Sequence, residues 1–537
     1  MTDWRFADVW EVVAGTLPDA PATSHGGVRR SWQELEARAE GQAAWLTSLG
    51  LARQDRVAQY LYSGPEYIES LFACFKAGYV PVNTNYRYGV EELAYLWGDA
   101  GCAAVVFHGC FAETIERMQA SGRAATVKGW LWVDDGSGPC PEWATPFEQV
   151  ATSGDRQADR PARSGDDLWL LYTGGTTGYP KGVMWRQDDI FSVVNQTAAV
   201  RFPEHGTLED VAAMLVRSGP VLIPAAPLMH GTGTIAAFGA LSSGGCVATL
   251  TGRSFDAVEM LDLIEADRAK SVAIVGDAFA KPLLRALDAQ PHRWDISSLR
   301  VMSSSGVMWS APVKQGLLRH NPKLILVDTL GSSEAIGMAK SIVSGDDDAA
   351  GTASFRLGPD TQVFTDDCRA VVPGSGESGV LALRGRGPIG YFNDPEKSAK
   401  TFRMIGGERW AMPGDHATVE NDGTIRLLGR GSQCINTGGE KVYPEEVEAA
   451  LKAQPSVLDA AVVGVADDRF GQAVTALVAT APGATFDEAR LISGVKSQLA
   501  GYKAPRRIIE VDDVGRAPNG KLDYAALLAR AETATKA

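Results

Sequence analysis

The 537-residue sequence contains few cysteines, and their spacing argues against two kinds of site. Seven cysteines are spread along the chain, an odd number, and none forms a C-x-x-C pair. Disulfide frameworks use even sets of cysteines, and structural zinc sites use closely spaced pairs. We therefore expect neither a disulfide scaffold nor a cysteine-ligated metal centre, and the free thiols favour a reducing, cytoplasmic location.

The sequence also lacks a long uninterrupted apolar run. Its N-terminus has acidic residues at positions 3 and 8 and no apolar segment of the kind found in a signal peptide. The most apolar region, residues 220–250, is interrupted by Pro224, Pro227, His230 and several glycines. We therefore expect neither a signal peptide nor a membrane-spanning helix.

Basic residues are too few to balance the acidic ones. The chain has 51 lysines and arginines against 65 acidic residues, a net charge of −14, which disfavours nucleic acid or an anionic membrane as the main partner. An anionic cofactor would therefore need cations placed locally around it. Hydrophobic residues make up 45% and charged residues 22%, as in an ordinary globular protein, and the length suggests three or four domain-sized units.

A glycine-rich stretch stands out against this ordinary composition. Residues 168–183 read LWLLYTGGTTGYPKGV, in which five apolar residues precede a segment rich in glycine and threonine. The apolar run predicts a buried strand, and the glycines let successive backbone N–H groups converge on an anion. The segment is not a Walker A loop, because Pro180 precedes its lysine and Gly182 follows it.

The stretch therefore predicts a polyphosphate site of another kind. Its candidate residues are Thr173, Gly174, Gly175, Thr176, Thr177, Gly178 and Lys181. A flexible turn between two strands would explain a shorter match, but ten positions in this order favour the phosphate site. Residues 173–182 resemble the phosphate loop of the adenylate-forming superfamily, which includes acyl-CoA synthetases, luciferases and peptide-synthetase adenylation domains. Gly174 stands where that family commonly has serine.

A second matching segment, PLMHGTG at residues 227–233, resembles the family segment beside the reacting carboxylate. The resemblance implies a catalytic role for His230, whereas a lone histidine is otherwise more often a core or surface group. Residues 232–245 are mostly small and apolar. They suit the wall of a roomy acyl pocket, and close helix packing would explain them equally well.

Two later segments resemble the family's adenine and metal sites. The turn after residue 301 implies that Gly306, Val307 and Met308 cover adenine. DTLGSSE at residues 328–334 resembles the Y-G-x-T-E motif, which implies Mg²⁺ at Glu334 and phosphate at Ser333. The adenine or ribose candidates of this segment are Asp328, Thr329, Leu330 and Gly331. Leu330 replaces the usual aromatic residue, so weaker stacking is expected, and Glu334 alone could equally start a helix.

Ribose and hinge positions follow further along. WAMPGD at residues 410–415 resembles the family's Y-x-T-G-D motif, which implies that Asp415 accepts both ribose hydroxyls through its two carboxylate oxygens. Arg430 is the second ribose or phosphate candidate. Ser432 replaces the charged hinge residue that the family commonly has, so a charge-dependent switch is not expected here.

The C-terminal part resembles the family's mobile small domain. Gly438, Gly439 and Lys441 match a loop that implies coenzyme A binding, with the glycines leaving room for a thin pantetheine arm. Lys521 ends RAPNGK, which resembles the family's last motif and implies a catalytic lysine brought in by a lid. For any other C-terminal lysine, a solvated side chain would be the default interpretation.

The resemblance implies an α/β fold with a large multi-subdomain N-terminal domain and a small mobile α+β lid. The expected boundaries are an AMP-binding domain at 1–430, a hinge at 431–432 and a C-terminal lid domain at 433–537. The implied reaction uses ATP, Mg²⁺ and coenzyme A to convert a carboxylic acid to acyl-AMP and then to a thioester. Lys521, Glu334 and His230 are the implied catalytic residues.

The class of carboxylic acid is inferred from two weaker features of the sequence. Residues 220–250 contain no acid to pair an amino-acid ammonium, and GGTTGYPKGVMWR resembles synthetases of bacterial lipid and sterol side-chain degradation. We therefore expect a fatty or bulky alicyclic acid. Two alternatives remain, an acyl-AMP ligase that loads a carrier protein and a catalytically silent nucleotide-binding regulator. A homo-oligomer also remains open.

Overall fold

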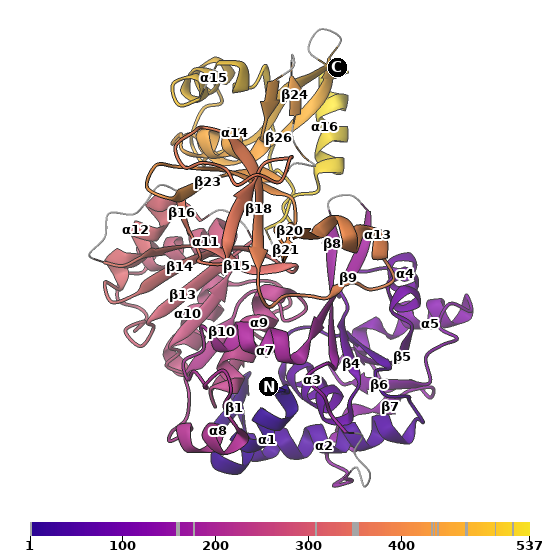
Figure 1. The fold of residues 1–537 in the computed structure, drawn as a ribbon. Helices are drawn as coiled ribbons and strands as arrows, with labels where there is room; N and C mark the ends of the chain where they lie inside the picture. Colours follow the sequence, from indigo (N-terminus) through magenta and orange to yellow (C-terminus); the bar gives the residue numbers. More distant parts are fainter. Residues whose placement is uncertain are drawn as a thin grey trace.

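The fold is described from a computed structural model. It describes residues 3–156, 162–175, 178–306, 309–345, 354–430, 433, 435–437, 440–467, 471–499, 501–517 and 520–536. Three β-sheets organise this part of the chain, two in the N-terminal part and one near the C-terminus (Figure 1).

The largest sheet has the strand order β2-β1-β11-β10-β12-β13-β14-β15-β16-β23-β22-β18-β21-β20, with β17 beside β18. The strands from β1 to β14 in this order are parallel neighbours, and the pairing is antiparallel from β15 onward. The parallel strands end at one edge, where open α/β sheets bind ligands. The bounds are β1 Pro21–His25, β2 Val28–Ser31, β10 Val221–Pro224, β11 Cys246–Thr249, β12 Ser271–Ile274, β13 Val301–Ser305, β14 Ile325–Ser332, β15 Ala335–Val343, β16 Ser354–Leu357, β17 Thr361–Phe364, β18 Ser378–Arg384, β20 Phe402–Ile405, β21 Glu408–Ala411, β22 Asp415–Val419 and β23 Thr424–Arg430.

The second sheet has the order β19-β9-β8-β4-β3-β5-β6-β7. Its parallel strands β3, β4, β5 and β8 join an antiparallel hairpin of β8 and β9. The bounds are β3 Arg56–Tyr60, β4 Val80–Asn83, β5 Cys102–His108, β6 Gly129–Val133, β7 Thr145–Pro146, β8 Leu168–Gly175, β9 Gly178–Arg186 and β19 Gly390–Tyr391.

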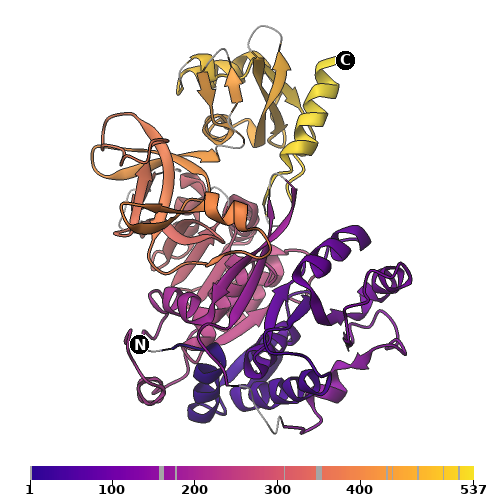
Figure 2. The same cartoon turned by 45° about the vertical axis from the view of Figure 1, so that its right-hand side comes forward.

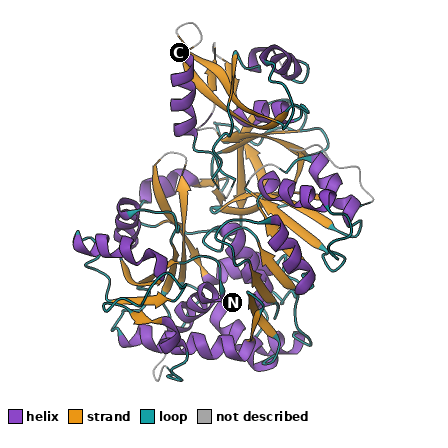
Figure 3. Ribbon diagram, turned by 180° about the vertical axis from the view of Figure 1, so that it is seen from behind, coloured by secondary structure: helices purple, strands orange, loops and turns teal. Residues whose placement is uncertain are grey.

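Helices cover the two sheets and fill the space between them (Figure 3). The buried side chains of α10, α11 and α12 pack on one face of the large sheet. Those of α1, α2, α3, α7 and α9 form a separate core with residues from both sheets. The bounds are α1 Phe6–Thr16, α2 Trp32–Ser48, α3 Pro65–Ala77, α4 Val90–Ala100, α5 Ala112–Ala120, α6 Phe147–Ala151, α7 Gln187–Asn195, α8 Leu208–Met214, α9 Gly231–Ser242, α10 Ala257–Ala266, α11 Gly276–Ala289, α12 Ala311–His320 and α13 Pro395–Thr401.

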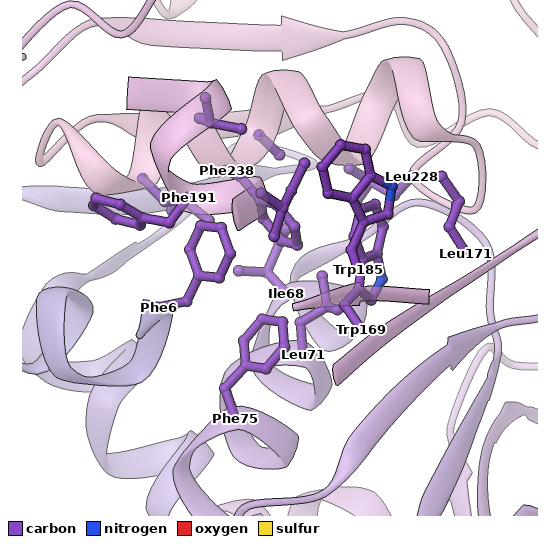
Figure 4. Close-up of a cluster of buried hydrophobic side chains, with 14 of the residues drawn as sticks. Phe6, Ile68, Leu71, Phe75, Trp169, Leu171, Trp185, Phe191, Leu228 and Phe238 are labelled. Atoms are coloured by element: carbon purple, nitrogen blue, oxygen red, sulfur yellow. The ribbon is translucent and has the colours of Figure 1, made fainter. Parts of the chain in front are cut away.

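Aromatic side chains dominate the core between the sheets (Figure 4). Phe238 of α9 lies 4.4 Å from Phe6 and 5.2 Å from Trp169, measured between ring centroids. Trp169 starts the hairpin strand β8, and Phe6 starts α1. Large buried rings contribute most of the apolar area in such a core. This packing therefore fixes the base of the hairpin against α9.

The C-terminal part forms a small α+β lid above the large sheet (Figure 2). Its sheet has the order β25-β24-β27-β26, with β28 beside β27, and helices pack on both faces. The bounds are β24 Ile435–Thr437, β25 Glu440–Val442, α14 Pro444–Lys452, β26 Val457–Asp467, β27 Gly471–Thr480, α15 Glu488–Lys496, β28 Arg507–Glu510 and α16 Tyr524–Lys536.

The expected α/β class, with a large N-terminal domain and a small C-terminal domain, is confirmed. Helix α3 ends at Ala77, and the next residue, Gly78, takes a left-handed φ of 73° that glycine adopts without strain. No helix in the described part of the chain is long and apolar enough to cross a bilayer.

Asp188 lies inside α7, where its carboxylate accepts hydrogen bonds from the backbone N–H of Trp4 and from Arg386. The alternative interpretation of Glu334 as the start of a helix does not hold, because it lies in the turn between β14 and β15. One local expectation was wrong. The strand expected to end at Tyr172 continues to Gly175, because cross-strand pairing with β9 extends into the glycine-rich segment.

Candidate active site

A cavity of about 1700 Å³ lies where the two N-terminal sheets meet the lid. Its wall includes the hairpin residues Thr173 and Lys181, the β14–β15 turn, and Lys521 of the lid. Three distant parts of the sequence therefore meet around one space. The candidates with side chains in its lining are Thr173, Lys181, His230, Asp328, Thr329, Leu330, Ser333, Glu334, Asp415 and Lys521, and Gly306 and Gly331 line it through their backbone.

The phosphate candidates sit on the hairpin of β8 and β9. Thr173 pairs with Lys181 and Gly175 pairs with Gly178, so the segment enters and leaves the tip as an extended ladder. Asn83 fixes the base of this ladder. Its side chain accepts a 2.6 Å hydrogen bond from the Tyr172 N–H and donates to the Tyr172 carbonyl at 2.8 Å and to the Met229 carbonyl at 2.7 Å. Asn83 thus joins the hairpin to the segment that precedes His230.

Lys181 makes an ion pair with Asp394, which is also the N-cap of α13. The Asp394 carboxylate additionally accepts a 2.9 Å hydrogen bond from the Lys397 N–H. The hydrogen bond from Lys181 is the main cause of a lowered pKa at Asp394. Lys181 is therefore held by a carboxylate outside the hairpin.

The metal candidate Glu334 is oriented by a tyrosine. The Tyr391 hydroxyl donates a 2.7 Å hydrogen bond to Glu334 Oε1. Trp185 of β9 donates from Nε1 to the Ser333 carbonyl at 3.0 Å, so the turn is tied to the hairpin. Among the described residues, no cluster of three or more potential metal ligands exists. Mg²⁺ typically takes one or two carboxylates together with phosphate oxygens and water, so a single glutamate beside a phosphate site fits this ion.

The adenine candidate Asp328 forms a buried ion pair. Lys314 of α12 donates to Asp328 Oδ2 at 3.1 Å, and both side chains are almost fully buried. Burial raises the pKa of Asp328 to about 6, and the Lys314 charge opposes that rise. Asp328 is the fourth residue of β14 and the register partner of Ser304, one residue before the parallel pairing with β13 ends.

His230 precedes α9 at the wall of the cavity. Burial lowers the pKa of His230 to about 3, and the positive charge of Lys521 contributes to the lowering, followed by that of Arg87. His230 is therefore a neutral imidazole at pH 7. His230 and the lid residue Lys521 line the same cavity.

Arg516 holds the loop that carries Lys521. Its Nε donates to Asp459 Oδ2 at 2.6 Å, one terminal nitrogen donates to Asp459 Oδ1 at 3.0 Å, and the other donates to the Gly520 carbonyl at 3.0 Å. The Ala517 N–H also donates to the Lys521 carbonyl at 2.8 Å. A planar guanidinium fork suits such bidentate pairing. Lys521 thus sits on a loop with a defined backbone.

Several candidates lie outside the described residues. These are Thr176, Thr177, Val307, Met308, Ser432, Gly438 and Gly439, and the side chains of Arg430 and Lys441 are not described either. Gly174, Gly175 and Gly178 are described as backbone of β8 and β9. Arg430 of β23 is the register partner of Asp415 of β22, so the two ribose candidates lie side by side on neighbouring strands.

Comparisons with known proteins agree with this geometry. Residues 10–391 match the family of AMP-binding enzymes, and residues 446–521 match the AMP-binding enzyme C-terminal domain. The chain therefore belongs to the AMP-binding enzyme family.

Its curated relatives in that family include several acid–CoA ligases. The medium/long-chain-fatty-acid–CoA/3-oxocholest-4-en-26-oate–CoA ligase of Mycobacterium tuberculosis is 39% identical and covers 97% of this chain and 95% of its own. The 3-oxocholest-4-en-26-oate–CoA ligase of Rhodococcus rhodochrous is 36% identical and covers 97% of this chain and 94% of its own.

Solved structures share the fold. The ATP-bound MatB of Rhodopseudomonas palustris has a TM-score of 0.81 at 27% identity, and covers 98% of this chain and 99% of its own. The anthranilate CoA ligase AuaEII in complex with anthranoyl-AMP has a TM-score of 0.84 at 21% identity, which supports the fold alone, and covers 100% of this chain and 98% of its own.

We expect Lys314→Met to destabilise the protein by about 3–5 kcal/mol at pH 7, because it leaves a buried carboxylate unpaired. Without the ammonium, the already raised pKa of Asp328 rises further. At pH 5 the folded protein then holds a proton that the unfolded chain has released, so the destabilisation should shrink as the pH falls. Urea unfolding at both pH values measures this.

The matched control adds Asp328→Asn to Lys314→Met. Since this second change removes the buried charge, the double variant should recover most of the lost stability at pH 7 and lose the pH dependence. An equal loss at pH 5 and pH 7 in the single variant would contradict a role for the Asp328 charge.

Proposed function

We propose that this chain, an AMP-forming acid–CoA ligase by its family and relatives, activates a medium- to long-chain fatty acid or a sterol side-chain acid. Lys521 on the lid and the phosphate hairpin line one cavity, and this is the observation on which the proposal rests. The acid class comes from the relatives' names and from the small apolar residues of α9.

In this proposal the hairpin and Lys181 bind the triphosphate, and Asp415 and Arg430 hold the ribose. Asp328, Thr329, Leu330 and the turn at 306–308 take the adenine. Glu334 and the phosphate oxygens would hold Mg²⁺, which supplies charge neutralisation at the reacting phosphate. Ser333 donates to phosphate from the turn that Trp185 fixes.

The first half-reaction joins two anions, a carboxylate and a triphosphate. Lys521 lowers the repulsion by placing an ammonium at the reacting centre, an effect that is largest where water is excluded. His230 borders the carboxylate as a neutral group, because its pKa lies far below 7. The attack forms a C–O–P linkage and releases pyrophosphate.

The second half-reaction requires a different lid position. We assign residues 1–430 to the large domain, 431–432 to a hinge and 433–537 to the lid. Rotation at the hinge would withdraw Lys521 and present Gly438, Gly439 and Lys441 to coenzyme A. The CoA thiolate then attacks the acyl carbonyl and AMP leaves.

The function is tested by measuring AMP and pyrophosphate release over a panel of carboxylic acids, with and without coenzyme A. We expect AMP formation that depends on a medium- to long-chain or sterol acid and is accelerated by coenzyme A. Turnover that needs an acyl carrier protein instead would identify a carrier-loading ligase. Absence of turnover with every acid, despite ATP binding, would identify a nucleotide-binding regulator.

Lys521→Ala should lower the rate of adenylate formation by about 10²–10³-fold, the loss typical of one electrostatic stabiliser of a transition state. It should spare thioester formation from supplied acyl-AMP, because Lys521 has left the site in that step. Single-turnover assays of each half-reaction measure the two effects. Equal losses in both half-reactions would refute the assignment of Lys521 to adenylate formation alone.

Tyr391→Phe should raise the Mg²⁺ concentration needed for half-maximal adenylation by about tenfold, because a hydrogen bond to a metal-binding carboxylate keeps it oriented toward the ion. The variant removes only the hydroxyl that donates to Glu334. Mg²⁺ titration of the adenylation rate measures the effect. As a control, Tyr502→Phe changes an exposed tyrosine of the lid and should leave the titration unchanged. An unaltered Mg²⁺ requirement in Tyr391→Phe would exclude this role.

A further inference from the structure

The cavity continues beyond the nucleotide candidates along the face of the large sheet. Val301 and Ser303 of β13 line it, as does Ile342 of β15. β12, β13 and β14 are parallel, so their first residues mark the end of the cavity that lies farthest from Asp328 and Glu334. At a rise of roughly 3.3 Å per residue, β13 alone spans about 13 Å. The cavity is therefore long as well as wide.

Apolar residues of two helices line this extension. They are Val193 of α7 and Ile235, Ala236 and Gly239 of α9. A Cβ added at Gly239 would lie 3.4 Å from Val194 of α7, so the two helices approach each other closely there. The helical wall of the extension is therefore apolar and closely packed.

The sheet face on the other side carries apolar side chains among polar ones, since Ser271, Ser303 and Lys340 line the cavity there as well. Val327 and Ile342 are register partners on β14 and β15, and both line the cavity. Ile342 is 60% exposed, and Ile325, two residues before Val327 on the same face, is 42% exposed. Contiguous exposed apolar side chains at a groove mark a ligand surface more often than a solvated one.

Cations gather at the far end of the cavity, a group that we call the distal cations: Arg201, Lys270 and Arg300. The Arg300 N–H donates to the Lys270 carbonyl at 2.9 Å, so these two residues are neighbours at the starts of β12 and β13. Lys270 and Arg201 make no side-chain hydrogen bond or ion pair with any other described residue. Arg300 donates from one terminal nitrogen to the carbonyls of Ser297 and Leu299.

The described carboxylates in the cavity wall lie elsewhere. Asp328, Glu334 and Asp415 are near the nucleotide candidates, and the remainder are Glu445, Glu446 and Glu448 on α14 of the lid. The cavity thus has an apolar middle and a distal end whose described charges are positive. An isolated cation at the end of an apolar channel favours a ligand that ends in an oxygen acceptor.

We propose that the distal cations bind an oxygen acceptor at the end of the acyl group remote from its carboxylate. The inference rests on the proposed function and narrows its substrate. Of the two acid classes, it favours a rigid ring-bearing acid with a remote oxo group over a fatty acid that ends in a methyl group. The acyl body lies between α7, α9 and the sheet, and the oxo oxygen accepts from Lys270 and Arg300.

The physical reason is a difference in desolvation. An oxo group at the end of an apolar body loses hydrogen bonds to water when the body enters the channel, and a charged donor restores one. A methyl group gains nothing from that donor. Because Lys270 and Arg300 are exposed to solvent, water competes with the acceptor, so the preference should be near tenfold.

The experiment compares kcat/KM for AMP formation with two matched acids, a sterol side-chain acid with an oxo group on its distal ring and the same acid without it. In the wild-type chain the oxo acid should be preferred by about tenfold. We expect this preference to shrink or disappear in Lys270→Gln and in the double variant Lys270→Gln/Arg300→Gln. In both variants kcat/KM for the oxo acid should fall, and kcat/KM for the other acid should stay within about twofold of the wild-type value.

Lys323→Gln is the matched control. Lys323 is an exposed cation two residues before β14, at the same edge of the sheet, and it is not part of the cavity wall. Lys323→Gln should leave kcat/KM unchanged for both acids. Lys270→Gln alone tests the proposal even if the double variant folds poorly, since the exposed Lys270 side chain makes no hydrogen bond or ion pair with another described residue.

The outcomes separate the inference from the function on which it rests. Equal kcat/KM for the two acids in the wild type, or equal losses for both in the variants, would overturn the distal site and leave the ligase assignment intact. Absence of AMP formation with every acid in the wild type would overturn both.

Discussion

The contribution of the lid to the cavity depends on one ion pair, between Arg516 and Asp459. The Arg516 guanidinium donates hydrogen bonds to both carboxylate oxygens of Asp459 on β26 and to the carbonyl of Gly520, the residue before Lys521. A lysine side chain is long and has high rotamer entropy, so a charge at its tip is useful only if its backbone is fixed. Asp459 provides that fixed point from β26, whose backbone pairs with β27 along nearly its whole length. The fold of the lid thus fixes the backbone position of Lys521.

The same logic applies to the large domain. Asn83, Trp185 and Tyr391 each join the phosphate hairpin or the β14–β15 turn to a neighbouring segment through one hydrogen bond or more. None of them needs to react. Each restricts a loop whose glycines would otherwise leave it free, and preorganised groups stabilise a transition state without a reorganisation cost.

The sequence predicted which segments meet, because each candidate motif follows a strand and strand ends share one edge of a parallel sheet. It did not predict the partners that hold them. Asn83, Tyr391 and Asp394 all lie outside the segments that supplied site candidates. Lys314 lies in a helix with no motif, and its partner Asp328 is on a strand, so no local pattern links them. Arg516 is five residues from Lys521, yet its partner Asp459 is 57 residues away. The extension of β8 was missed because glycine and threonine are weak strand signals without their pairing partner.

The charge balance of the cavity explains how a chain of net charge −14 can serve an anionic substrate. Lys181 is neutralised by Asp394 across the hairpin, and that carboxylate is also the cap of α13. If a triphosphate binds Lys181 in place of Asp394, the Asp394 carboxylate still accepts the hydrogen bond from the Lys397 N–H, so it keeps one donor. His230 remains neutral beside Lys521 and adds no competing charge. In the proposed reaction the ammonium of Lys521 acts on the acyl carboxylate and the reacting phosphate, from a loop that Arg516 and Asp459 hold beside the cavity.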